Sequence, residues 1–191
     1  LEFKVYGVSR TKPQTKDKKF VWIKADLTTS QGLKEILKFV KEERVDFLAN
    51  NVGLAFEEKA IDFKDASYMK MFSLNFISPI KIASLLSSKL KDGLIINTSS
   101  ISDRLVGEGD GLYSASKAAL NSFFEAYALE NPRIKVFNIL PSYIDTPLQH
   151  KLSDNIKDFP WEENMKPNQV AGCVSFLIEN KEKFSSGSRI V

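Results

Sequence analysis

The sequence predicts an α/β domain in which parallel strands are joined by crossover helices. Short apolar runs alternate with longer amphipathic segments along the whole chain, the pattern of a parallel sheet covered by helices on both faces. No internal repeat and no low-complexity linker divides the sequence, and 191 residues fit one compact domain. We therefore expect residues 1–191 to form a single, doubly wound α/β domain.

The chain begins with two predicted strands and a helix. Apolar runs at 3–8 and 20–25 are separated by a polar, lysine-rich turn over 10–19. Thr28 or Ser30 is placed to cap the helix after the second run. The apolar positions of this helix recur at helical spacing: Leu33, Ile36, Leu37 and Val40.

The same alternation continues through the rest of the chain. The predicted strands span 45–49, 94–98, 133–140 and 188–191. The predicted helices span 62–90, 112–130 and 168–180. Pro79 predicts a break in the first of these helices, and Pro141 ends the strand at 133–140. A glycine-rich loop, residues 107–111, precedes the second helix.

Composition excludes several classes of protein. The net charge of +3 comes from 27 basic and 24 acidic residues in mixed order, without the segregated basic face of a nucleic-acid-binding protein. A single cysteine, Cys173, excludes an internal disulfide framework and predicts a reducing, cytoplasmic location. Its apolar neighbours predict a buried small side chain. No apolar run approaches the roughly 18 residues needed to cross a bilayer, so no membrane association is predicted.

The strongest chemical signal is the pair Tyr113 and Lys117. Four residues apart on a predicted helix, they project from the same face. At about 4 Å and an effective dielectric of about 20, an ammonium stabilises a phenolate by on the order of 4 kcal/mol. We therefore expect Lys117 to lower the pKa of Tyr113, which then serves as a general acid and base.

The Tyr-x-x-x-Lys spacing alone is a weak sign of catalysis, because amphipathic helices also produce it by chance. Ser100 strengthens the catalytic interpretation. It stands thirteen residues before Tyr113, at the end of a predicted parallel strand. The carboxyl ends of such strands are where open α/β sheets bind their ligands. The three residues together favour a catalytic interpretation.

Six segments then match, in order, motifs of the short-chain dehydrogenase/reductase family, which the sequence resembles from its first residue to its last. They are 5–10, 25–27, 50–53, Asn75, Ser100 with 113–117, and 141–146. Asn50-Asn51-Val52-Gly53 resembles the family's Asn-Asn-Ala-Gly turn, and Ser142 replaces a family glycine. The resemblance implies a Rossmann-type fold and hydride transfer between a nicotinamide cofactor and a small carbonyl or alcohol substrate.

The resemblance also implies a role for each matched residue. Tyr113 would donate its proton to the substrate carbonyl, or withdraw one from the alcohol, and Ser100 would hydrogen-bond the substrate oxygen. Lys117 would hold the nicotinamide ribose. Asn75 would anchor a water that links Lys117 to solvent; the alternative is a helix asparagine that bonds backbone. Further cofactor contacts are implied for Asp26 and Leu27 at the adenine, Asn51 and Gly53 at its ribose, and Ile144 and Thr146 at the carboxamide.

Ser9 and Arg10 bear on the choice of cofactor. Sites that prefer NAD carry an acidic residue at the end of this strand, where it bonds the ribose 2′-hydroxyl. A hydroxyl followed by a guanidinium instead suits a 2′-phosphate, so the sequence favours NADP(H) over NAD. Lys16, Lys18 and Lys19 are interpreted as a solvated basic loop.

The family's first strand and its glycine-rich, pyrophosphate-binding turn have no counterpart in the sequence. The two acids of the loop at 107–111 would repel a phosphate. In the family's strand order the missing strand is central, so we expect strands 3–8 and 45–49 to face each other across about 9.5 Å. We also expect the chain to be part of a longer polypeptide, with about 30 residues before Leu1 and a few after Val191.

Two functions remain in view. The first is a hydride-transferring enzyme, favoured by Ser100, Tyr113 and Lys117; the second is a catalytically silent relative that binds a nucleotide or regulates a partner. Residues 147–166 occupy the place of the family's substrate loop, in which His150 is predicted to be a surface residue. Three aromatics of the helix at 112–130 predict a homodimer or homotetramer interface, or else pack on the sheet: Phe123, Phe124 and Tyr127.

Overall fold

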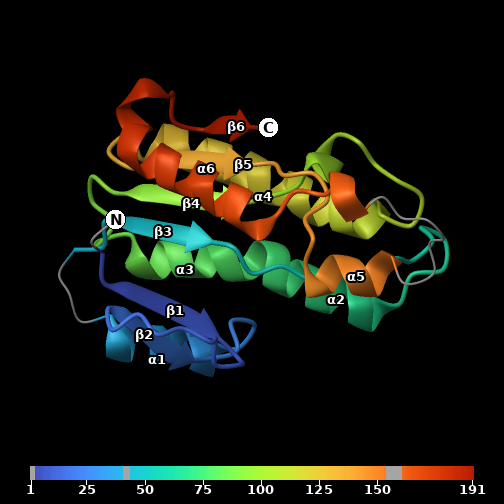
Figure 1. Ribbon diagram of the computed structural model, residues 1–191, viewed down its shortest axis with the longest axis horizontal. Helices are drawn as coiled ribbons and strands as arrows, with labels where there is room; N and C mark the ends of the chain where they lie inside the picture. Colours follow the sequence, from blue (N-terminus) through green and yellow to red (C-terminus); the bar gives the residue numbers. More distant parts are fainter. Residues whose placement is uncertain (1–2, 41–43, 154–160) are drawn as a thin grey trace.

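The computed structural model describes residues 3–40, 44–153 and 161–191, and its strands form two parallel sheets that lie side by side (Figure 1). In the first sheet, β1 (Val5–Ser9) pairs with β2 (Phe20–Lys24). The second sheet has the order β3 (Phe47–Asn50), β4 (Leu94–Thr98), β5 (Lys135–Ile139) and β6 (Ser188–Ile190). All pairs are parallel, which confirms the predicted α/β class.

Helices cover both faces of the second sheet. One cluster of buried side chains places α1 (Ser30–Phe39), α3 (Ser78–Leu86) and α4 (Gly111–Glu130) on the same side. A second cluster places α6 (Pro167–Asn180) on the opposite face. Strand β4 is buried on both sides, because Ile95 joins the first cluster while its neighbours Leu94 and Ile96 join the second. The chain is therefore a Rossmann-type, doubly wound domain.

Short elements complete the fold between these helices and strands. They are α5 (Pro147–Ser153) and three 3-10 turns: η2 (Ile101–Asp103), η3 (Trp161–Glu163) and η4 (Lys181–Lys183). Cys173 is half-buried among the apolar side chains of α6, where burial raises the pKa of its thiol. Within the described residues, no helix combines the length and apolar composition of a bilayer crossing.

The helical region before β4 corrects one sequence expectation. Helix α2 (Asp65–Phe72) runs into a π-helical turn, η1 (Ser73–Ile77), and then into α3. The predicted break near Pro79 is therefore wrong, because Pro79 is the second residue of α3 and lies inside a continuous helical region. Proline removes one backbone donor, and the π turn changes the hydrogen-bonding register immediately before it, so that the Ser78 N–H bonds the Ser73 carbonyl.

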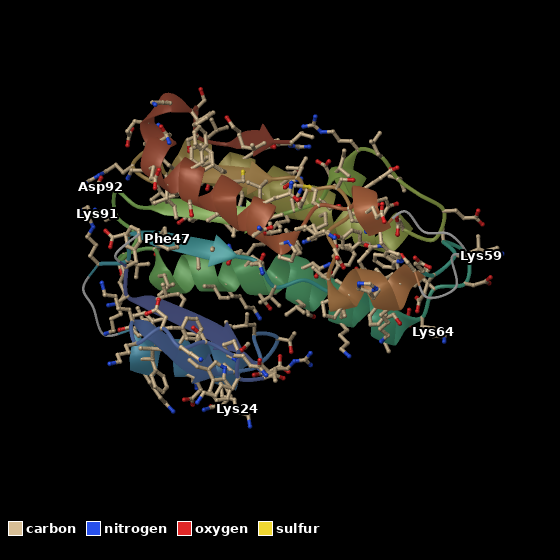
Figure 2. The ribbon with its side chains drawn as sticks, viewed as in Figure 1. Lys24, Phe47, Lys59, Lys64, Lys91 and Asp92 are labelled. Atoms are coloured by element: carbon tan, nitrogen blue, oxygen red, sulfur yellow. The ribbon has the colours of Figure 1, made fainter. Side chains whose placement is uncertain are left out.

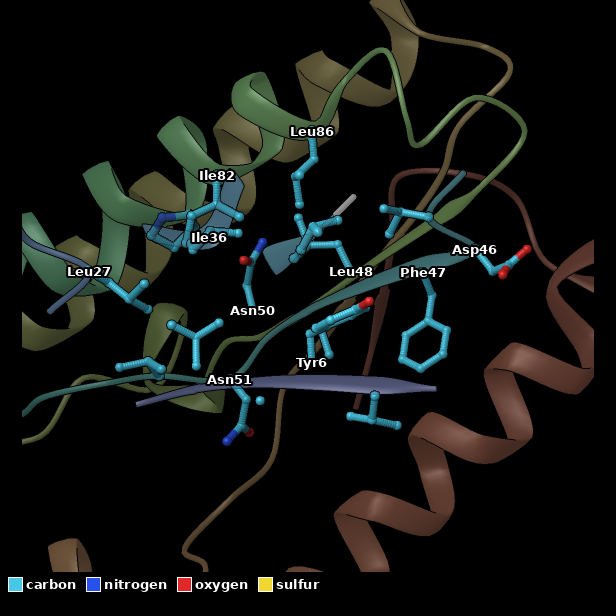
Figure 3. A pocket seen from close by; sticks show the side chains of 18 of the residues that line it. Tyr6, Leu27, Ile36, Asp46, Phe47, Leu48, Asn50, Asn51, Ile82 and Leu86 are labelled. Atoms are coloured by element: carbon cyan, nitrogen blue, oxygen red, sulfur yellow. The ribbon is translucent and has the colours of Figure 1, made fainter. Parts of the chain in front are cut away.

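A cavity of about 700 Å³ separates the two sheets (Figure 3). Strand β1 pairs with β2 and β3 pairs with β4, and no ladder joins β1 to β3 among the residues that the structure describes. This confirms the predicted gap between the two strands. The cavity is lined mainly by apolar side chains, among them Tyr6 and Val8 of β1, Leu48 of β3, Ile36 of α1 with Val40 just after it, and Ile82 and Leu86 of α3.

The aromatic residues of α4 divide between the core and its border. Phe124 has no exposed surface and packs in the cluster beneath α4, so the expectation that it offers an oligomer interface is wrong. Its register on the helix turns it toward the sheet. Phe123 and Tyr127 are partly buried against the same cluster and contact one another's rings.

Three buried asparagines cross the second sheet near the carboxyl ends of its strands. Asn50 is in register with Asn97, and Asn97 with Asn138. Each amide donates to the next, Asn50 Nδ2 to Asn97 Oδ1 and Asn97 Nδ2 to Asn138 Oδ1, both at 2.8 Å. Because buried amides are costly unless bonded, this asparagine row fixes the relative register of β3, β4 and β5.

Gly32 lets α1 approach the preceding turn. The cap of α1 is Thr29, whose Oγ1 accepts from the Gly32 N–H at 3.0 Å, rather than the predicted Thr28 or Ser30. Thr28 instead donates to Asp26. A Cβ on Gly32 would lie 1.9 Å from the Asp26 carbonyl oxygen, far inside contact distance.

We predict that Gly32→Ala lowers the free energy of unfolding by about 1–3 kcal/mol, because the new methyl forces the backbone of α1 and Asp26 apart. Gly172→Ala in α6 is the matched control, since no atom lies within 4 Å of its added Cβ. The control should raise stability by about 0.5–1 kcal/mol, the usual gain of alanine over glycine in a helix. Urea unfolding measures both; equal effects at the two sites would contradict the close approach.

Candidate active site

The predicted catalytic residues meet above the carboxyl end of β4. Ser100 lies two residues beyond the strand, and Tyr113 and Lys117 lie one turn apart near the start of α4. Tyr113 and Ser100 interact through their side chains, and the Lys117 Nζ lies 5.7 Å from the centre of the Tyr113 ring. The structure thus brings together the three residues that the sequence singled out.

Ser100 is held by the 3-10 turn η2, which it caps. Its Oγ accepts from the Ser102 N–H at 3.1 Å and donates to the Ser102 hydroxyl at the same distance. Ser100 is buried, with 8% of its surface exposed. Its side chain also hydrogen-bonds Tyr113 and thereby lowers the pKa of the phenol.

Tyr113 departs from the sequence expectation in its acidity. Burial raises the pKa of its phenol, the carboxylate of Asp110 raises it further, and only the Ser100 hydrogen bond opposes them. The expectation that Lys117 lowers the pKa of Tyr113 is therefore wrong for this structure. The ammonium lies over the ring and donates to a backbone carbonyl, and burial has the largest effect on the pKa of the phenol.

Lys117 differs from the other lysines that the structure describes in being buried. Its exposed fraction is 4%, and its Nζ donates to the Thr98 carbonyl at 2.8 Å. Burial lowers the pKa of the ammonium to about 8. Four lysines with exposed side chains show the contrast at the edges of the molecule (Figure 2): Lys24, Lys59, Lys64 and Lys91.

Asn75 sits in the π turn η1 with 1% of its surface exposed. Its amide forms a two-way pair with the backbone of Leu54, accepting from the N–H and donating to the carbonyl, each at 2.8 Å. The same Nδ2 donates to Ser116 Oγ of α4 at 3.0 Å. Asn75 therefore joins η1, the segment after β3 and α4, which agrees with the backbone-bonding alternative; its role as a water anchor remains a prediction.

Gly53 brings the segment after β3 close to both polar groups. A Cβ at this position would lie 3.6 Å from Lys117 Nζ and 3.8 Å from Asn75 Oδ1. Two residues earlier in the same turn, Asn51 Oδ1 accepts from Thr98 Oγ1 at 3.0 Å. Gly53 and Asn51 thus border the space above the end of β4.

The residues predicted to bind the adenine end lie at the carboxyl end of the first sheet. The Ser9 hydroxyl donates to the Thr11 carbonyl at 2.6 Å and accepts from Trp22 Nε1 at 3.0 Å. It therefore acts as both donor and acceptor within the protein. Arg10 is exposed. Hydrogen bonds from Thr28 lower the pKa of Asp26, and the charge of Arg10 lowers it further.

Three other predicted cofactor residues differ in their surroundings. Leu27 is buried, and its carbonyl accepts from Ser78 Oγ at 2.7 Å. Ile144 forms a bridge with Met165, and Thr146 Oγ1 accepts from the Gln149 N–H at 3.3 Å at the start of α5. Both follow β5 and are partly buried. The predicted surface residue His150 is exposed, bonds Asp145 at 2.7 Å and stacks on Trp161.

Two features of the site escaped the sequence-based prediction. Thr98 has no signal of its own, because its carbonyl and not its side chain binds Lys117. Asp110 lies three residues before Tyr113, and this helical spacing is a signal that could have identified it as a charge beside the phenol. Its own pKa is raised by burial.

Comparison with known families identifies the chain. The model of the short chain dehydrogenase family matches residues 7–157, most of the sequence. The chain belongs to the short-chain dehydrogenase family. The predicted family resemblance and the α/β fold are thereby confirmed.

Characterised relatives of this dehydrogenase family lie at moderate distance. The chain is 24% identical over 177 residues to the 3-oxoacyl-(acyl-carrier-protein) reductase of Thermotoga maritima, spanning 86% of the chain and 72% of that protein. It is 26% identical over 182 residues to the NAD-dependent glycerol dehydrogenase of Listeria innocua, spanning 88% of the chain and 72% of that protein.

Solved structures share the fold. A short-chain dehydrogenase family protein from Francisella tularensis superposes with a TM-score of 0.88 at 24% identity, covering 98% of this chain and 85% of that one. The 3-ketoacyl-(acyl-carrier-protein) reductase from Brucella melitensis, solved with NADH, gives a TM-score of 0.85 at 21% identity with the same two coverages.

We predict that the pKa of Lys117 makes the stability of this dehydrogenase depend on pH. The pKa is about 8 in the fold against an ordinary 10.5, so between these values the unfolded chain binds more protons and stability rises with pH. Below pH 8 the folded protein holds a charged, buried ammonium, which lowers its stability; a methionine at this position carries no charge at any pH. Relative to the parent, Lys117→Met should lose about 3 kcal/mol of stability as pH rises from 7 to 10.5.

Urea unfolding at a series of pH values measures this difference, and groups common to both proteins cancel. Lys24→Met is the control, because Lys24 is exposed and its substitution should shift stability equally at every pH. A Lys117→Met difference as flat as that of the control would show that Lys117 keeps its ordinary pKa.

Proposed function

We propose that the chain is an oxidoreductase that transfers hydride between NADP(H) and a small carbonyl or alcohol, with Tyr113 as the general acid and base. The observation that carries the proposal is the meeting of a partly buried phenol, a buried ammonium and a capping hydroxyl at the carboxyl end of β4. Family membership supports it, and relatives include reductases and a dehydrogenase.

The residues present fit the nicotinamide end of a dinucleotide. An ammonium has three N–H donors, and within the described part of the chain Lys117 spends one on Thr98. The other two can face the ribose hydroxyls over Gly53, where the missing side chain leaves room beside Nζ. Bound there, the nicotinamide supplies or accepts the hydride.

The proton follows a separate route through the protein. During reduction, hydride adds to the carbonyl carbon, the C=O π bond breaks and the Tyr113 hydroxyl gives its proton to the oxygen. Ser100 donates a hydrogen bond to that oxygen as negative charge develops on it. Because burial raises the pKa of Tyr113, the phenol is protonated at neutral pH and ready to donate.

We predict that Tyr113→Phe lowers kcat at least about 100-fold, because the proton donor is lost, and that Ser100→Ala lowers it about 100- to 1,000-fold. Oxidation of NADPH is followed with a panel of 3-oxoacyl thioesters, sugars and small ketones. NADPH binding, measured by fluorescence, is the control and should survive both changes. A parent chain inactive toward the whole panel, but able to bind NADPH, would favour a catalytically silent relative.

Cofactor choice rests on Arg10, since Ser9 is already bonded within the protein. An exposed guanidinium at the end of β1 can bind a 2′-phosphate through two parallel hydrogen bonds. The Listeria relative is NAD-dependent and the Brucella structure contains NADH, so an NADP(H) preference has to be tested on this chain itself.

We predict that Arg10→Gln raises the KM for NADPH about tenfold or more and leaves that for NADH within about twofold, because only NADPH carries the phosphate. Lys16→Gln, in the same basic loop, is the control and should alter neither value by more than about twofold. Steady-state kinetics with both cofactors provide the measurement. Equal losses for NADH and NADPH would refute the phosphate assignment.

A further inference from the structure

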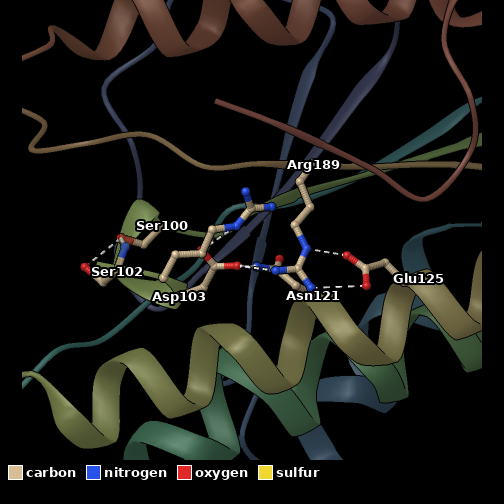
Figure 4. Close-up of polar contacts among 7 residues, drawn as sticks. Ser100, Ser102, Asp103, Asn121, Glu125 and Arg189 are labelled. Carbon is tan, nitrogen blue, oxygen red and sulfur yellow. Dashed lines mark hydrogen bonds and ion pairs between the residues drawn. The ribbon is translucent and has the colours of Figure 1, made fainter. Parts of the chain in front are cut away.

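A partly buried charge network begins at Asp103, three residues after Ser100 (Figure 4). The side chain of Asp103, the last residue of η2, has no exposed surface. Its Oδ2 accepts from Arg189 Nη1 of β6 at 2.6 Å and from Asn121 Nδ2 of α4 at 2.9 Å. Arg189 in turn binds Glu125 of α4 through both Nε and Nη2.

The network reaches Ser100 through one turn of backbone. The Asp103 N–H donates to the Ser100 carbonyl at 3.2 Å, while Ser100 Oγ accepts from the Ser102 N–H. A single 3-10 turn has little stability of its own. Its orientation therefore depends on what fixes its two ends. At the start, the Ile101 N–H donates to the Pro141 carbonyl at 3.1 Å; at the other end, the side chain of Asp103 is bonded to β6 and α4.

Arg189 connects this turn to the sheet. It is in register with Asn138, so it continues the asparagine row onto β6. From there its guanidinium stands between the carboxylates of Asp103 and Glu125, which raise its pKa, the Glu125 hydrogen bond most strongly. Arg104 also approaches Asp103, at 3.7 Å, but its side chain is 54% exposed. Arg189, whose side chain is 24% exposed, is thus the less exposed of the two counter-charges beside the buried carboxylate.

We propose that Asp103 is a positioning residue for Ser100: tethered to β6 and α4 through Arg189 and Asn121, it fixes the orientation in which the Ser100 hydroxyl meets Tyr113. The tether acts through Ser100 and not on the substrate itself. The kinetic consequence rests on the proposed function, whereas the ordering of η2 does not.

A double-substitution cycle tests the proposal. Asp103→Asn should lower kcat about 10- to 100-fold, the cost of a misplaced catalytic group, while the KM for NADPH stays within about twofold. In a Ser100→Ala background the same substitution should change kcat less than twofold, because no hydroxyl remains to be positioned. Equal losses in both backgrounds, or no loss in the parent, would overturn the proposal.

Arg189→Gln and Arg104→Gln form a matched pair of guanidinium losses beside the same carboxylate. The first should reproduce the kcat loss of Asp103→Asn, and the second should leave kcat within about twofold, since exposed pairs contribute little. If Asp103→Asn does not fold, Arg189→Gln and Arg189→Lys replace it in the double-substitution cycle with Ser100→Ala. Equal losses for Arg189→Gln and Arg104→Gln would count against the tether.

Amide hydrogen exchange separates this proposal from the function on which it rests. Peptides covering 99–106 should exchange at least about tenfold faster in Asp103→Asn and Arg189→Gln than in the parent or in Arg104→Gln. A parent with no turnover but with this exchange pattern would defeat the proposed function and keep the tether. Unchanged exchange in both variants would defeat the tether even in an active enzyme.

Discussion

The site depends on one interaction, the hydrogen bond from the buried Lys117 ammonium to the Thr98 carbonyl. A buried ammonium is costly unless it finds acceptors, and the interior of a sheet offers few because its carbonyls bond the neighbouring strands. The last residue of β4 is where such a carbonyl becomes available. The bond therefore fixes the start of α4 above the end of β4, and the helix then places Tyr113 one turn earlier, beside Ser100.

Other contacts keep this arrangement closed. The asparagine row aligns the ends of β3 and β4, so that Asn51 and Gly53 leave β3 level with Thr98. Asn75 then holds the backbone of Leu54 against α4. Each contact joins segments far apart in sequence, and each is made by an amide that would be costly to bury alone. These buried amides thus position the segment after β3 relative to Thr98 and α4.

Local pattern and spacing were enough to predict the main elements and the three residues that meet at the end of β4. Periodicity located the strands and long helices, and one helical turn between Tyr113 and Lys117 placed both on one face. Local pattern did not predict that Lys117 would bond the Thr98 carbonyl, because that contact depends on where β4 ends. Strand register, which aligns Asn138 with Arg189, and the burial of Phe124 likewise arise only from tertiary packing.

In the proposed function, the residues for chemistry and those for cofactor choice stand on different sheets. Ser100, Tyr113 and Lys117 stand on the second sheet, and their contacts run within it and its helices. Ser9 and Arg10 stand on the first, which reaches the second through the apolar contacts of α1 and α3. The residues proposed for proton transfer are therefore held by polar bonds, whereas those proposed for cofactor choice are placed relative to them by apolar packing.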